Sequence, residues 1–158
     1  MGDSYPVTKE GYEALKSTLH EMKTVERPKV IQAIAEARAH GDLSENAEYA
    51  AAKEKQAILE SRIQDYENRV AISQVIDPAT IREDRVVFGA TVTVLDLDTE
   101  QEKTYKIVGD HEGDLKIGKI SIQSPLARVM IGRRVGDVFD FQTANGLKEL
   151  EITKLIYK

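Results

Sequence analysis

The sequence contains no cysteine and no tryptophan, and only 4 of its 158 residues are proline. The absence of cysteine excludes a disulfide framework, a cysteine-ligated zinc and a thiol nucleophile. The three histidines (His20, His40 and His111) are too scattered to predict a metal cluster. No stretch approaches the roughly 18 consecutive apolar residues of a membrane span, and the first residues lack the basic run and apolar core of a secretory signal. We therefore expect a cytoplasmic protein with no membrane contact.

The chain also has no excess of positive charge. It carries 22 Lys and Arg against 27 Asp and Glu, for a formal net charge of −5. A protein that holds duplex DNA by displacing counterions needs a basic surface, so this mode of binding is excluded. Hydrophobic residues make up 41% of the chain, which is typical of a globular protein rather than a disordered one. Any contact with nucleic acid must be local or arranged by another partner.

The two halves of the chain differ in their hydrophobic period. Residues 8–75 are rich in Ala, Glu, Lys and Leu, whereas from Asp77 onward β-branched residues alternate with polar ones and glycines recur. Pro78 disfavours a helical residue before it, so a helix should end there. We expect an α+β protein of two domains: an antiparallel α-helical coiled-coil hairpin over residues 1–76, and a small antiparallel β-sheet domain with one short helix over residues 77–158.

The hairpin follows from a three-four spacing of apolar residues in two segments of the first half. Because no third long helix exists to cover them, a coiled coil is favoured over a larger bundle. When the two segments are folded antiparallel about residues 41–44, the numbers of the positions that face one another have a nearly constant sum. Three of these facing pairs are Leu19 with Tyr66, Met22 with Ile63, and Ala33 with Ala52.

One step in the first segment is irregular. The seam runs from Met22 to Glu26 to Val30, beside Pro28, and so contains an extra four-residue step. Such a step is a stutter, which locally relaxes the supercoil.

The turn at residues 41–49 carries more acidic residues than a turn requires. Asp42 with Glu45 fits a capping box that opens the second helix, and Ser44 is a second N-cap candidate. A good helical turn is thus one explanation of the segment. However, Asp42, Glu45 and Glu48 gather three carboxylates near one extremity, and carboxylate oxygens are suitable ligands for Mg²⁺. Two such groups would bind Mg²⁺ weakly, and a full site would need ligands from a partner.

Residues 35–49, AEARAHGDLSENAEY, resemble the tip signature of the GreA/GreB family of bacterial transcription elongation factors. The likeness continues through residues 87–94, 104–109 and 124–128, and so covers nearly the whole chain. The acidic net charge resembles the GreA branch more than the more basic GreB branch.

The resemblance implies a cofactor of bacterial RNA polymerase rather than a stand-alone enzyme. In this family the coiled coil enters the polymerase's secondary channel and stimulates Mg²⁺-dependent cleavage of backtracked nascent RNA, which rescues arrested complexes. Asp42 and Glu45 would act at the polymerase active centre and share a transient Mg²⁺ with it; no cofactor is bound tightly, and DNA contact is weak, through the elongation complex. The resemblance also implies an FKBP-like fold for residues 77–158.

Further residues are candidates for contacts with the polymerase and its RNA. Arg38 and Lys53 could counter phosphate charge at the RNA 3′ end; solvated flank residues are the alternative. Ser124, Pro125 and Leu126 are a candidate docking surface, although capping by Ser124 with Pro125 at the first helical position explains them almost as well.

Three questions stay open at this point. Asn46 is either a polar residue of a first helical turn or a water-positioning group. Tyr49 lies at a seam position, which favours packing in the core over a role in the tip site. The alternatives to a cleavage factor are an inhibitory paralogue that blocks the same channel and an FKBP-like isomerase. Asp42 and Glu45 favour the cleavage factor, and the few aromatic residues of the second half, assigned by alternation to the core, argue against an isomerase pocket. We expect a monomer, since the hairpin satisfies its own seam.

Overall fold

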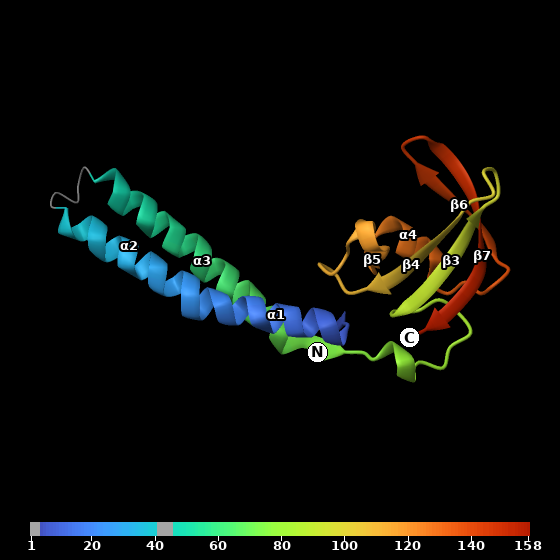
Figure 1. Cartoon of the computed structure of the whole chain (residues 1–158), viewed down its shortest axis with the longest axis horizontal. Coiled ribbons are helices and arrows are strands. Elements are labelled where there is room, and N and C mark those ends of the chain that lie inside the picture. The colour runs from blue at the N-terminus through green and yellow to red at the C-terminus, as the bar shows by residue number, and fades with distance from the viewer. Residues whose placement is uncertain (1–3, 41–45) are drawn as a thin grey trace. The chain divides into compact units, whose positions relative to one another are not determined.

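The computed structural model describes residues 4–40 and 46–158 (Figure 1). Its described residues form two compact units. The first, Tyr12–Ser73, is called the hairpin unit here; the second, which joins Ser4–Gly11 to Gln74–Lys158, is called the β unit. The expected α+β fold, with a helical hairpin followed by a β-sheet domain, is confirmed. The domain boundary between residues 76 and 77 stays a prediction.

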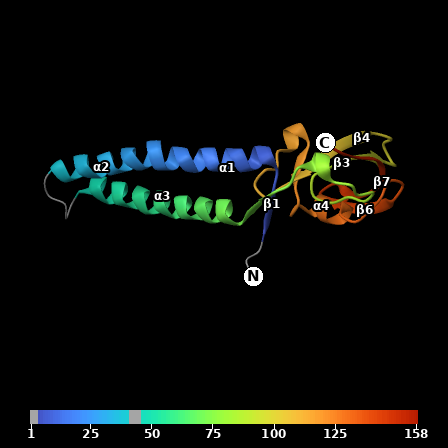
Figure 2. The same ribbon diagram turned by 90° about the horizontal axis from the view of Figure 1, so that it is seen from below.

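Two long antiparallel arms make up the hairpin. The first arm consists of α1 (Lys9–Glu21), a π-helix (Met22–Glu26) and α2 (Arg27–Ala39). The second arm is α3 (Ala47–Ile72), which lies beside α2 in both views (Figure 2). Among the described helices, none is long and apolar enough to cross a membrane.

The core of the hairpin centres on Met22, Leu59 and Ile63, of which Met22 is fully buried and Ile63 only 2% exposed. Three partly buried side chains pack against this cluster: Leu19, Val30 and Tyr66. Met22 and Ile63 therefore meet as the heptad spacing predicted, and Leu19 and Tyr66 join the same cluster. This narrow seam provides the main apolar burial of the two arms.

The irregular seam step has a clear structural cause. At Met22–Glu26 the first arm is a π-helix, and the N–H of Arg27 donates to the carbonyl of Met22, five residues earlier. Pro28 follows at once and has no N–H to donate to the preceding turn. A π-helix places one extra residue in a turn and so changes the face presented further along α2. Beyond it, Ala37 is buried and Ala33 is exposed, and Ala33 lines the same shallow groove as Ala52, its predicted partner.

Two sheets belong largely to the β unit. A small one pairs β1 (Tyr5–Val7) with β2 (Ser73–Val75), and the larger one has the strand order β5-β4-β3-β7-β6. Its strands are β3 (Ala90–Asp96), β4 (Glu102–Val108), β5 (Lys119–Ser121), β6 (Val138–Thr143) and β7 (Gly146–Tyr157). The expected short helix is α4 (Pro125–Met130), which has six residues.

The larger sheet is not wholly antiparallel, which corrects the prediction in one detail. β5 pairs parallel with β4, with Ile107 opposite Ile120, whereas the other neighbouring strands are antiparallel. Parallel neighbours need a crossover connection rather than a tight hairpin. Residues 109–118, which include a 3₁₀ turn at Leu115–Ile117, provide that connection.

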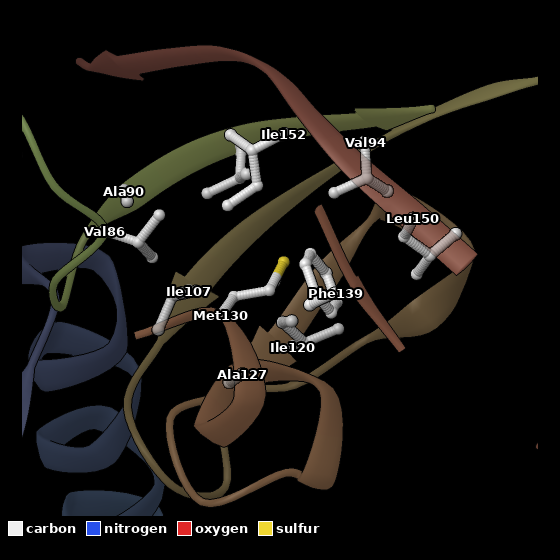
Figure 3. Close-up of a cluster of buried hydrophobic side chains, with 11 residues drawn as sticks. Val86, Ala90, Val94, Ile107, Ile120, Ala127, Met130, Phe139, Leu150 and Ile152 are labelled. Atoms are coloured by element: carbon white, nitrogen blue, oxygen red, sulfur yellow. The ribbon is translucent and has the colours of Figure 1, made fainter. Parts of the chain in front are cut away.

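One face of the sheet packs against α4 to form the main core (Figure 3). Met130 and Ala127 of α4 are fully buried, and Ile152 and Phe139 come from β7 and β6. Tyr105, Phe141 and Tyr157 pack around this cluster, as the alternation pattern predicted.

Tyr157 also closes the end of the sheet. Its hydroxyl donates to the carbonyl of Arg85 at 2.6 Å and accepts the N–H of Val87 at 3.0 Å. Burial raises the pKa of the Tyr157 hydroxyl, because the charged form would lose its hydration.

Candidate functional site at the end of the hairpin

The predicted catalytic and metal-binding carboxylates, Asp42 and Glu45, lie outside the described residues. Their assignment therefore stays a prediction. Within residues 4–40 and 46–158, no three Asp, Glu or His side chains gather into a potential metal site. The described part of the candidate site is its rim, formed by the last turn of α2 and the first turns of α3.

Asn46 connects the two arms at this rim. Its side-chain oxygen accepts the backbone N–H of Tyr49 at 3.0 Å, which makes it the N-cap of α3. Its side-chain amide donates to the carbonyl of Ala37 at 2.7 Å, in the last turn of α2. Asn46 thus caps α3 as the structure describes it, while the other capping candidates, Asp42 and Ser44, lie outside the described residues. One side chain therefore satisfies a free N–H of one helix and also bonds to a last-turn carbonyl of the other, which accepts the N–H of His40 as well, at 3.3 Å.

Replacing Asn46 by alanine should therefore destabilise the hairpin unit. The loss of an N-cap costs about 1 kcal/mol, and the loss of the bond to Ala37 adds to it. Thermal unfolding followed by far-ultraviolet circular dichroism measures this change. Gln64→Ala removes an exposed amide from the same helix and should stay within about 0.5 kcal/mol of wild type. Equal effects of the two substitutions would contradict the bridging role.

Arg38 and Tyr49 face one another across the two arms. The guanidinium carbon of Arg38 lies 5.9 Å from the centre of the Tyr49 ring, at the outer limit of a cation–π interaction. Tyr49 is half-buried and lies outside the hairpin's buried cluster, whereas its seam position predicted packing in the core; Arg38 is exposed. The ring thus supports the guanidinium at the rim and leaves it accessible to a ligand.

Lys53 lies one turn further along α3 than Tyr49, and positions four residues apart are neighbours on a helix surface. Its side chain is exposed, and its amine donates to Gln56 at 3.2 Å. The structure therefore places both candidate RNA contacts, Arg38 and Lys53, on the surface beside Tyr49. Their role in binding RNA stays a prediction.

Glu48, the third acidic residue of the predicted tip cluster, is paired with His40. The two side chains approach to 3.4 Å and are 72% and 63% exposed. A contact this exposed contributes little stability, and it is an ion pair only when His40 is protonated. The pair links the end of α2 to the first turn of α3.

The candidate docking residues of the β unit have clear structural roles. Ser124 caps α4 by accepting the N–H of Ala127 at 3.3 Å, and Pro125 occupies the first helical position and is exposed. Leu126 packs against the core and lines a pocket of about 180 Å³ together with Val94, Tyr105 and Phe141. Capping and packing account for these residues, and a docking role stays a prediction.

Comparison with known proteins gives a consistent result over both units. The family model "Transcription elongation factor, N-terminal" matches residues 5–75, and "Transcription elongation factor, GreA/GreB, C-term" matches residues 81–157. The chain is 54% identical over 153 residues to the transcription elongation factor GreA of Phenylobacterium zucineum, covering 97% of this chain and 98% of that one. It is also 54% identical over 155 residues to GreA of a Psychrobacter species, covering 98% of each.

A solved structure, that of GreA factor homolog 1 of Thermus thermophilus, is 23% identical. It covers 96% of this chain and 98% of its own, with a TM-score of 0.45.

Proposed function

Because this chain belongs to the GreA/GreB family of transcription elongation factors, we propose that it enters the secondary channel of RNA polymerase and stimulates the polymerase's cleavage of backtracked nascent RNA. The observation that carries this proposal is the GreA/GreB tip signature, with its two acidic residues Asp42 and Glu45, at the turn of a two-helix hairpin. The chain would act as a cofactor of the polymerase and not as an enzyme alone.

The hairpin is suited to reaching into a narrow passage. The 26 residues of α3 span about 39 Å at 1.5 Å per residue. Toward the turn the buried side chains become as small as those of Ala37 and Ala52. Small side chains allow two helices to approach closely, so the arms need little width at this end.

The chemistry would come from Asp42 and Glu45 together with carboxylates of the polymerase. When bound, Mg²⁺ makes its water more acidic and stabilises charge that develops on a phosphodiester. Asp42 and Glu45 would supply carboxylate oxygens for such an ion, and Mg²⁺ commonly takes only one or two of these while it keeps several waters. No tightly bound cofactor is required.

The rim would assist by charge and by position. Arg38 and Lys53 are exposed cations that can offset the phosphate charge of the RNA 3′ end. Asn46 secures the α3 side of the turn through its bonds to Tyr49 and Ala37.

The β unit would dock on the polymerase through Ser124, Pro125 and Leu126. The protein would act as a monomer in the cytoplasm, and its contact with DNA would be indirect, through the elongation complex.

The decisive experiment uses purified backtracked elongation complexes with labelled RNA. The protein should shorten the RNA from its 3′ end only when polymerase and Mg²⁺ are both present, and removal of Mg²⁺ by a chelator should stop the reaction. Slower cleavage than by polymerase alone would indicate an inhibitory factor that blocks the channel. RNA cleavage without polymerase would contradict the cofactor role.

A further inference from the structure

The first turn of α1 has an incomplete capping box. Thr8 is its N-cap, because the Thr8 hydroxyl accepts the N–H of Gly11 at 3.0 Å. In a complete box, a Glu or Gln at the position of Gly11 would reach back to the N–H of the N-cap residue. A glycine in that position cannot do so.

Glu112 completes this box from the connection between β4 and β5. One of its carboxylate oxygens accepts the N–H of Thr8 at 3.1 Å, and the other accepts the Thr8 hydroxyl. Thr8 is only 3% exposed, so these bonds satisfy groups that water does not reach. A carboxylate also interacts favourably with the positive end of a helix dipole.

The same carboxylate is fixed to its own loop. The oxygen that accepts from Thr8 also accepts the N–H of Gly109 at 2.7 Å. Glu112 therefore joins two segments that are about a hundred positions apart in the sequence.

Two glycines make room for this carboxylate. A Cβ at Gly11 would lie 2.0 Å from the nearer oxygen of Glu112, and a Cβ at Gly109 would lie 2.4 Å from the other oxygen and 2.6 Å from the carbonyl of Pro6. The space that a local Glu would occupy at position 11 is thus taken by Glu112.

We propose that Glu112 is a positioning residue for RNA cleavage. Its carboxylate ties the first turn of α1 to the connection between β4 and β5. The start of α1 belongs to the β unit, and the same helix continues into the hairpin unit. A helix held at its first turn has a fixed starting point, and catalysis depends steeply on the position of reacting groups. This role rests on the proposed function, because its effect is on cleavage.

A double substitution, called the exchanged variant here because it moves the carboxylate from position 112 to position 11, separates the link between the two segments from simple helix capping. Glu112→Ala removes the carboxylate, and adding Gly11→Glu restores a capping box within α1 without restoring the bond to Gly109. Amide hydrogen exchange should show Thr8 and Gly109 losing protection in Glu112→Ala, and Thr8 alone regaining it in the exchanged variant.

Cleavage rates at saturating protein give the functional result. Glu112→Ala should reduce the rate about tenfold, with the half-saturating concentration nearly unchanged. The exchanged variant should stay slow, whereas Glu112→Gln, which keeps one acceptor oxygen, should recover most of the rate. Glu102→Ala, which removes an exposed carboxylate from β4, should match wild type.

Each negative result has its own meaning. Full cleavage by the exchanged variant would reduce Glu112 to a capping role and overturn the proposal. Wild-type cleavage by Glu112→Ala would overturn it as well. A wild-type protein that stimulates no cleavage would instead overturn the proposed function, while the exchange protection of Thr8 and Gly109 would still decide whether the tie exists.

Discussion

Stimulated cleavage of backtracked RNA should fall by about 100-fold when Asp42 is replaced by Asn or Glu45 by Gln, because each substitution removes a charge that stabilises the reacting centre. The neutral amides keep the size of the side chains and remove most of their affinity for Mg²⁺. The measurement is the rate of RNA shortening in backtracked complexes at saturating protein. Raising the Mg²⁺ concentration should partly restore the rate, since the defect is in metal affinity.

A matched control is available three residues beyond Glu45. Glu48 is an exposed carboxylate paired with His40, so Glu48→Gln should leave cleavage close to wild type. The Asp42 and Glu45 variants should still compete with the wild-type protein for polymerase. Wild-type cleavage by both variants would contradict the proposed metal role, and loss of competition would indicate that the carboxylates serve structure or docking.

Replacing Ile63 by alanine should destabilise the hairpin unit by about 3 kcal/mol, the usual cost of removing a large buried aliphatic side chain. Ile63 is 2% exposed and belongs to the small cluster with Met22 and Leu59. Because so few side chains are fully buried in this unit, neighbouring residues have little capacity to compensate. Thermal unfolding followed by far-ultraviolet circular dichroism measures the helical signal directly.

The matched control lies on the same helix. Ile58 is 56% exposed, so Ile58→Ala should change the free energy of unfolding by no more than about 0.5 kcal/mol. Amide exchange at Ile152, whose N–H donates to Asp137 within the β unit, should be unaffected by either substitution. Equal destabilisation by the two variants would contradict the assigned hairpin core.

Much of this fold is predictable because its signals are local and repeated. The heptad spacing places Met22 and Ile63 in the hairpin core, and the alternation of β-branched with polar residues from Asp77 onward predicts the sheet of the β unit. The parallel pairing of β5 is different, because its short strand carries no signal of direction. That pairing depends on the crossover through residues 109–118.

The candidate site was predictable only in part. Its acidic residues follow from the tip signature, but the choice of N-cap does not, since Asp42, Ser44 and Asn46 are all good capping residues. Asn46 has a second partner, the carbonyl of Ala37, to which its side-chain amide donates and which only the folded hairpin brings near. Glu112 was missed for a similar reason: its partner Thr8 is distant in sequence, and a capping box is normally sought within four residues.

The π-helix at Met22–Glu26 sets the rotational phase of everything that follows it on the first arm. Each residue of an α-helix turns the chain by about 100°. Without the extra residue in this turn, the remainder of α2 would turn a different face toward α3. Arg38 would then no longer face Tyr49. The π-helix therefore determines the direction in which the last side chains of α2 point. It does so without disrupting the apolar contacts between the two arms.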